Sequence, residues 1–299
     1  MIWIPLTLLA VTMQVLRTAG QKRLTVQLDP LTVTLVRYLF GLPFVLAYLA
    51  VLTRGFSAEL PEPNTTFWVF CAIASLAQIG ATALLLLLFQ LRSFVVGTSY
   101  ARTEVFLTAL LGSVFFGEAI PLLGWAAIVL SVAGVLVLTV ARMGHADAGG
   151  SVPWRRSAAL GLLSGLLFAI TSLSLRRASL SFGIDDFLLT AALVLGTMVG
   201  LQTVLLGGYL AWHSPDELRG TLRLWRPCLF VGVTSAAGSA GWFTAMTVER
   251  ATYVKALGQI EFVLALGVST LFFRERATRP ELAGMALVGA GILVLLRAS

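Results

Sequence analysis

Two stretches of the chain, residues 68–138 and 225–295, repeat one pattern without a gap, and each carries a glutamate inside an apolar span. A constant offset of 157 residues separates the copies. It aligns Trp68 with Trp225, Cys71 with Cys228, Ala83 with Ala240, Glu104 with Glu261, Phe115 and Phe116 with Phe272 and Phe273, Glu118 with Glu275, and Gly134 with Gly291. Each copy holds about three long apolar stretches. An odd number of crossings inserts the second copy upside down relative to the first.

Composition places the repeats in a membrane. The 299 residues are 58% hydrophobic and 12% charged, whereas a soluble domain has about 25% charged residues. Most of the chain must therefore face lipid. The net charge of +7 favours contact with anionic headgroups and not with nucleic acid, because no basic run exceeds two residues. Cys71 and Cys228 open apolar spans and are interpreted as small hydrophobic residues.

Ten apolar stretches are long enough to cross a hydrocarbon core, which needs roughly 20 residues per helix. We expect spans at Ile2–Ala19, Leu31–Leu52, Phe67–Leu91, Phe94–Phe116, Ile120–Val140, Ser157–Leu175, Phe187–Trp212, Cys228–Thr247, Thr252–Phe273 and Glu281–Leu296. The first is expected to be a permanent span, because no basic region precedes Ile2. Residues 143–156 contain Gly149-Gly150-Ser151 and are the predicted linker between repeats 1–142 and 157–299. The predicted fold is an all-α polytopic membrane protein of two inverted five-helix repeats around a central cavity.

Three local motifs connect this pattern to a known family. Arg37 lies in Leu-Val-Arg-Tyr-Leu-Phe-Gly, and Phe-Phe-Gly-Glu118 and Phe-Phe-Arg-Glu275 close the fourth and ninth spans, each followed by a glycine-rich helix. The chain thereby resembles the EamA-type ten-span members of the drug/metabolite transporter superfamily. The resemblance implies a basket of ten helices with a peripheral fifth helix in each repeat, a monomer or homodimer, and no cofactor. Many relatives export amino acids or other small metabolites, and others import solutes.

The sequence departs from the family at two matched positions. Relatives commonly have a proline about fourteen residues before the glutamate that ends the span, and here Glu104 and Glu261 take that place. Glu104 lies roughly 21 Å from Glu118 along a helix, which is close to the bilayer centre. A charge there costs at least about 2.5–3.5 kcal/mol, so both carboxylates should face the bundle interior and be paired or protonated.

Two basic residues on the same helices are the predicted partners. Arg102 is two residues from Glu104 and Lys255 is six residues from Glu261, so neither cation faces its own glutamate. We therefore expect Lys255 or Arg102 to reach a carboxylate of the opposite repeat. The functional interpretation is a substrate and coupling site, and the alternative is a buried ion pair that fixes the register of the repeats.

Further side chains are expected to line the same cavity. The glutamates together with aromatic rings could hold an ammonium group, and the basic residues a carboxylate, which favours an amino-acid-like zwitterion. Arg37 is a substrate contact or a structural anchor near a span end. The remaining candidates are Tyr100, Tyr253, Gln78, Ser235, Ser239, Trp242 and Gln259. We assign Glu118 and Glu275 to turns at span ends, where an acid near the following helix N-terminus is favourable.

Other functional classes have less support. The chain lacks His-Glu-x-x-His, a nucleophile elbow and a phosphate-binding loop, so we expect no enzyme and no metal site. A flippase for a lipid or lipid-linked headgroup is the main alternative, with Arg274, Arg276 and Arg279 as a basic rim. A non-transporting assembly subunit is the third, and it would not need either glutamate.

The expected function is secondary active export of a small polar, amino-acid-like solute, with protons as the candidate coupling ion. We expect a multi-pass protein of a cell membrane, a bacterial inner membrane in particular. Loops after the odd-numbered spans carry twelve basic residues and the other side five, which favours external termini. The family resemblance implies cytoplasmic termini, and the sequence leaves both orientations open.

Overall fold

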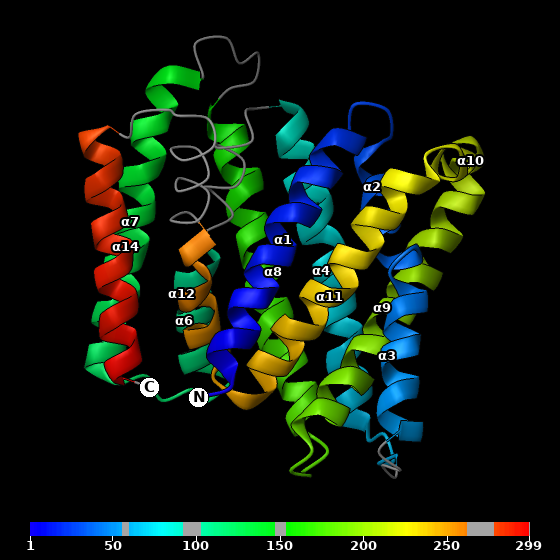
Figure 1. Cartoon of the computed structure of the whole chain (residues 1–299), viewed down its shortest axis with the longest axis horizontal. Coiled ribbons are helices and arrows are strands. Elements are labelled where there is room, and N and C mark those ends of the chain that lie inside the picture. Colours follow the sequence, from blue (N-terminus) through cyan, green and yellow to red (C-terminus); the bar gives the residue numbers. More distant parts are fainter. Residues whose placement is uncertain (56–59, 92–102, 147–153, 262–277, 299) are drawn as a thin grey trace.

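The computed structural model describes residues 1–55, 60–91, 103–146, 154–261 and 278–298, and every regular element in these ranges is an α-helix. The helices run between two ends of one bundle, and both termini lie at the same end (Figure 1). Their bounds are α1 Trp3–Leu24, α2 Pro30–Leu39, α3 Leu42–Gly55, α4 Thr65–Leu91, α6 Glu104–Phe115, α7 Leu122–Ala146, α8 Trp154–Leu180, α9 Phe187–His213, α10 Pro215–Arg223, α11 Trp225–Val248, α12 Ala251–Gly258 and α14 Arg279–Ala298.

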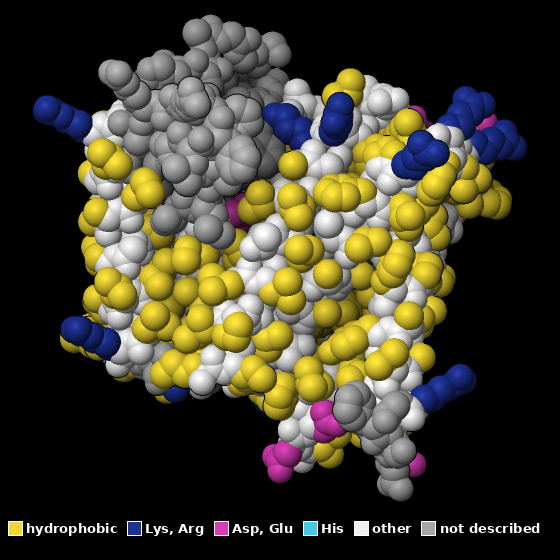
Figure 2. Space-filling model, viewed as in Figure 1, with side chains coloured by type: hydrophobic (Ala, Val, Ile, Leu, Met, Phe, Trp, Pro, Cys, Tyr) yellow, Lys and Arg dark blue, Asp and Glu magenta, His cyan; other side chains and the backbone are white. Residues whose placement is uncertain are grey.

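Five segments of the described chain are long and apolar enough to cross a membrane. They are Pro30–Arg54, Thr65–Gln90, Ala158–Leu180, Phe187–His213 and Trp225–Val248, and shorter apolar helices cover Glu104–Phe115, Leu122–Val137 and Leu282–Arg297. Figure 2 shows hydrophobic side chains over the middle of the visible face, with most lysines and arginines toward its two ends. A lipid-facing band between two polar edges is the surface expected of a membrane bundle.

The predicted second span is broken into two helices. Asp29 starts α2 by accepting a hydrogen bond from the Leu31 amide at 2.9 Å, and Pro30 occupies the first turn. The helix ends at Leu39, and α3 begins after Gly41. The backbone here lies against α11, since a Cβ added to Gly232 would come within 2.5 Å of the Phe40 backbone. The break places the C-terminal turn of α2 deep inside the bundle.

Helix packing follows the repeat. The 157-residue offset carries α1 onto α8, α2 and α3 onto α9, α4 onto α11, and α7 onto α14. The large contact between α1 and α11 is thus the equivalent of the large contact between α4 and α8. The two repeats therefore interlock, because the first helix of each packs on the third helix of the other.

The fifth helices of the two repeats, α7 and α14, pack mainly against each other at one edge (Figure 1). A Cβ added to Gly134 would meet the Val288 backbone at 2.7 Å, and one added to Gly291 would meet that of Ser131 at 2.8 Å. These two contacts are equivalent under the 157-residue offset. The peripheral position implied by the family resemblance is confirmed.

A short helix, α10, occupies the segment between the predicted seventh and eighth spans. Its apolar and polar residues lie on opposite faces, Asp216 pairs with Arg219 at 2.9 Å, and both side chains are exposed. Glu217 accepts a hydrogen bond from the Asp29 amide at 3.1 Å and so joins α10 to the start of α2. Amphipathic helices of this kind suit a membrane interface.

Candidate functional site

A cavity of about 70 Å³ lies between helices of both repeats, enough for a few water molecules. Helices α1, α2 and α4 line it from one repeat, α8 and α11 line it from the other, and the two glutamates lie at α6 and just beyond α12. The lining residues are Gln14, Arg17, Thr18, Arg37, Gln78, Leu85, Glu104, Phe168, Thr171, Ser172, Leu175, Ser239, Trp242, Phe243, Met246, Lys255 and Glu261.

Lys255 and Glu104 form an ion pair across the repeats. The Lys255 Nζ lies 2.6 Å from the Glu104 Oε1, and the two side chains are 14% and 11% exposed. Ser172 donates a second, longer hydrogen bond of 3.4 Å to the same carboxylate. The prediction that Lys255 or Arg102 reaches the opposite glutamate is confirmed for Lys255. Such a buried pair adds little net stability, because both charges lose their hydration.

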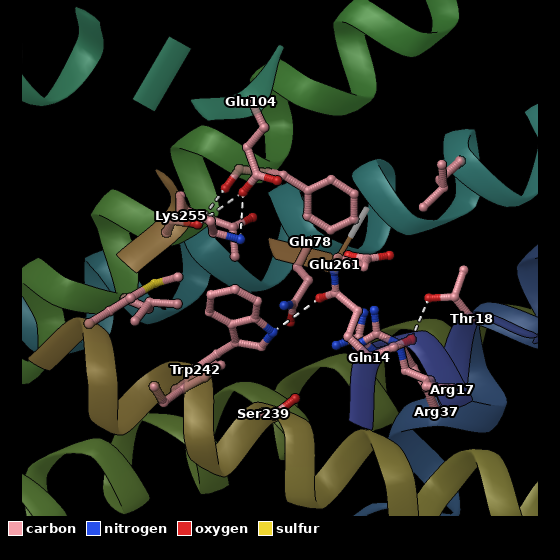
Figure 3. Close-up of a pocket in the computed structure, with 17 residues that line it drawn as sticks. Gln14, Arg17, Thr18, Arg37, Gln78, Glu104, Ser239, Trp242, Lys255 and Glu261 are labelled. Carbon is pink, nitrogen blue, oxygen red and sulfur yellow. Dashed lines mark hydrogen bonds and ion pairs between the residues drawn. The ribbon is translucent and has the colours of Figure 1, made fainter. Parts of the chain in front are cut away.

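A polar chain continues from this pair to the second glutamate (Figure 3). The Lys255 ammonium lies 4.7 Å from the centre of the Trp242 ring, and the Trp242 Nε1 donates to the Gln14 Oε1 at 3.0 Å. The Gln14 Nε2 in turn donates to the Glu261 Oε2 at 3.3 Å. Glu104 and Glu261 are thus linked through Lys255, Trp242 and Gln14, so a charge change at one can reach the other through direct contacts.

Arg37 also reaches the cavity and is only 4% exposed. Its Nη1 donates to the Thr82 Oγ1 at 3.1 Å, and its guanidinium lies 5.1 Å from the centre of the Tyr38 ring. The sequence suggested a position near a span end. The helix break at Gly41 explains the difference, because it places the end of α2 inside the bundle.

Gln78 and Ser239 line the cavity as predicted. The Gln78 Oε1 accepts a hydrogen bond of 2.8 Å from the Gln202 Nε2, which fixes the orientation of the Gln78 amide. Both Gln78 and Gln202 are buried. Gln78 therefore presents its amide nitrogen for other contacts.

The remaining candidates lie elsewhere. Tyr253 is fully buried, and its hydroxyl lies 2.9 Å from the place of a Cβ on Gly124 of α7, so its ring packs toward the periphery. Gln259 is buried, and neither its amide oxygen nor its amide nitrogen has a hydrogen bond within the described part of the chain. Neither residue is among those that line the cavity. Tyr100 and Arg102 lie outside the described residues.

Sequence reasoning missed the polar residues of the first span of each repeat. Gln14, Arg17, Thr171 and Ser172 all line the cavity. The repeat offset contained part of the signal, because it aligns Gln14 with Thr171 and Arg17 with Ser174, which are polar in both halves. A single polar residue in a long apolar helix does not show which face of that helix points into the bundle. Only the structure shows that these residues face inward.

Glu118 occupies a second buried polar cluster, at the end of the bundle that holds both termini. Its Oε1 accepts from the Ala251 amide at 3.2 Å and lies 3.6 Å from the Arg176 Nε, and its Oε2 accepts from the Thr252 Oγ1 at 2.8 Å. Arg176 also donates to backbone carbonyls at the end of α11, among them that of Met246. The acid does follow a span end, but it stabilises the N-terminus of α12 in the other repeat.

The described residues show no metal centre, since no three His, Cys, Asp or Glu side chains in those ranges gather closely enough to hold an ion. The interlocked repeats and the shared polar cavity define the molecule as a polytopic membrane protein of the two-repeat transporter class. The chain belongs to the EamA-like transporter family, whose model matches residues 1–140 and 155–297.

One solved crystal structure superposes on this chain with a TM-score of 0.71 and 18% sequence identity. The superposition includes 97% of this chain and 95% of the chain in that structure, and the likeness shows the fold. No curated protein matches the sequence significantly. The family establishes a membrane transporter, and the residues of this cavity must supply the argument for what it carries.

Proposed function

We propose that the protein is a secondary active exporter of a small polar, amino-acid-like solute, and that Glu104 and Glu261 couple its movement to protons. The main support for this proposal is the polar chain from Glu104 through Lys255, Trp242 and Gln14 to Glu261. The chain crosses between the repeats at the cavity, where alternating-access transporters bind their solutes. A cell membrane, the inner membrane of a bacterium in particular, is the proposed location.

The chemistry of the chain supports coupling. A solute ammonium that approaches Trp242 and Glu104 competes with Lys255 for the same carboxylate and the same ring. A proton on Glu104 also removes the charge that holds Lys255. Solute and proton therefore act on one contact, which is the arrangement required for exchange of one for the other.

The test compares wild type with Glu104→Gln, Glu261→Gln and the double variant in proteoliposomes. Currents on a solid-supported membrane are recorded for amino acids, amines and organic acids, with and without a pH gradient. We expect a solute-dependent current that a pH gradient drives in wild type and that falls at least tenfold in the double variant. Radiolabelled uptake in parallel detects electroneutral exchange.

Equal solute movement in wild type and the double variant would contradict a coupling role and leave the glutamates as structural partners. Arg279→Gln provides a control, since this arginine belongs to the rim considered for lipid headgroups and lies at the start of α14. Arg274 and Arg276 of that rim lie outside the described residues. Movement of a fluorescent phospholipid but of no soluble solute would favour the flippase.

A further inference from the structure

We propose that the solute carries one net negative charge and that its carboxylate binds at the Arg37 end of the cavity, beside Arg17. This inference rests on the proposed transport function and deepens it by naming the charge of the solute and the position of its anionic group.

The charges of the described residues that line the cavity do not balance. The described lining contains three cations, Arg17, Arg37 and Lys255, and two anions, Glu104 and Glu261. Lys255 is satisfied by Glu104 at 2.6 Å. Two arginines and one glutamate remain at the other end, where Figure 3 draws Arg17, Arg37 and Glu261 around Gln14. An excess cation inside a bilayer is costly, and a bound anion relieves that cost.

Arg37 has donor capacity that the protein does not use. One of its nitrogens, Nη1, donates to Thr82, while its Nε is buried and has no hydrogen-bond partner in the described ranges. The Arg37 guanidinium contacts the Tyr38 ring and the Thr82 hydroxyl. A guanidinium offers five N–H donors in a fixed fork that fits a carboxylate in a bidentate manner.

A small recess extends the cavity behind Arg37. Its volume is about 10 Å³, and Arg37 and Ser239 line both spaces. Ser235, which also lines the recess, has a buried hydroxyl without a hydrogen bond among the described groups. The recess thus brings two further hydroxyls to the side of Arg37, and both can donate to an anion. A buried donor without a partner is costly unless a ligand or water satisfies it.

The matched positions of the other repeat do not carry the same basic residues. The repeat offset aligns Arg37 with Val194 and Arg17 with Ser174, so neither arginine has a basic counterpart. We therefore place the anionic group of the solute at the Arg37 end of the described cavity, with the rest of the solute toward Trp242. An acidic amino acid and a simple monocarboxylate share this chemistry.

The test measures binding and transport separately with probes of similar size and different charge. Purified protein is titrated with glutamate, glutamine, ornithine, glutarate and lactate, with the shift of the thermal unfolding midpoint as readout, and counterflow is measured in proteoliposomes. We expect glutamate or a monocarboxylate to bind more tightly than glutamine or ornithine. A comparison of the affinity for glutamate with the affinities for glutarate and lactate distinguishes an amino-acid anion from a plain organic acid.

Substitution of the arginine locates the subsite. Arg37→Gln should weaken binding of the preferred anion about tenfold or more, the effect expected from loss of charge-assisted hydrogen bonds, and weaken binding of glutamine, which has no net charge, less. Arg37→Lys should recover part of the affinity, because it keeps the charge and loses the fork. Arg54→Gln is the matched control, since Arg54 is exposed at the end of α3 in the same predicted span.

Tighter binding of glutamine or ornithine than of the anions by wild type would contradict the anion subsite. It would not contradict the proposed transport. An equal loss of affinity for every probe in Arg37→Gln would overturn it too, because it would show general damage to the site. Absence of binding by all three anionic probes would have the same meaning. Tight anion binding without counterflow would leave the subsite intact and contradict the proposed transport.

Discussion

Lys255 makes two of the contacts that hold the cavity together, one with the Glu104 carboxylate and one with the Trp242 ring. The matched position in the first repeat is Thr98, so a lysine is present in one half only. Removal of one partner from a buried ion pair leaves the other charge without compensation, which commonly costs about 3–5 kcal/mol. Lys255 is therefore the residue at which stability and function can be separated.

Lys255→Met should lower the unfolding midpoint strongly, because Glu104 is then left buried without its cation. Lys255→Met combined with Glu104→Gln should regain most of the lost stability, since no unpaired charge remains, and should still fail to couple transport to a pH gradient. Thermal unfolding and proteoliposome flux measure the two effects. Wild-type coupling in the double variant would show that the pair only holds the repeats in register.

The sequence predicted the pairing of Lys255 but not the whole chain of contacts. Helical spacing alone excluded Glu261 as its partner, and the repeat supplied Glu104 as the alternative. Gln14 could not be predicted in the same way. A lone glutamine in an apolar span can face lipid headgroups, another helix or a cavity, and only packing against α11 brings it to Trp242.

At the scale of elements, the cluster around Glu118 joins four helices at the end of the bundle with the termini. Glu118 follows α6, stabilises the start of α12, and lies beside Arg176 of α8, which in turn binds the end of α11. Carboxylates at helix N-termini satisfy amides that have no partner within the helix. The cluster thereby joins both repeats at this end of the bundle.

Glu118→Ala should destabilise the protein by about 1–3 kcal/mol, because the Ala251 amide and Arg176 both lose an acceptor. Hydrogen exchange should quicken first at the amides of Ala251 and Thr252. Asp216→Ala is a matched control, since its pair with Arg219 is exposed and exposed pairs contribute about 0–1 kcal/mol. Similar exchange at α12 in both variants would argue against the proposed role of Glu118.

Close packing of α7 on α14 gives a second prediction at this scale. Gly291→Leu places a side chain where a Cβ already meets the Ser131 backbone at 2.8 Å, so the two helices must separate. We expect a lower unfolding midpoint and little change in solute affinity, because α7 and α14 do not line the cavity. Gly289→Leu is the control, since nothing lies within 4 Å of a Cβ there.

Hydropathy located most of the helices but not their interruptions. The break between α2 and α3 arises where Phe40 crosses Gly232 of α11, and a contact between distant segments leaves no periodic signal in either. Helix α10 was missed for a related reason. Its Ser-Pro-Asp start is as common in turns as at helix N-termini, and nine residues are too few to decide.

For the whole molecule, the interlocked repeats imply two end states that exchange which end of the cavity is closed. Glu118→Cys with Thr252→Cys places two thiols at the end of the bundle that holds the termini, where the native side chains make a hydrogen bond of 2.8 Å. A short reversible bifunctional thiol reagent should arrest counterflow, and reductant should restore it. Solute binding measured by thermal shift should persist.

The single-cysteine variants are the controls for this cross-link, and the native Cys71 and Cys228 are fully buried and should react slowly. Full counterflow in the cross-linked protein would show that this end does not open during transport. The repeat predicted two inverted halves from sequence alone. It could not predict which end is joined, because Arg176 has an alanine, Ala19, at its matched position.

The sequence differences between the two repeats also affect the free energies of the two end states. A carrier with two identical halves would have two end states related by a two-fold rotation and equal in free energy. Here Lys255, Arg37 and Arg176 align with Thr98, Val194 and Ala19, so the interactions formed in one end state have no copies in the other. The cavity of the empty carrier should therefore open toward one side of the membrane. It should open toward the other side only when bound solute or a proton compensates the difference in free energy. The side chains that differ between the halves therefore bias which way the empty cavity faces, whereas the gradients of solute and proton set the direction of net flow.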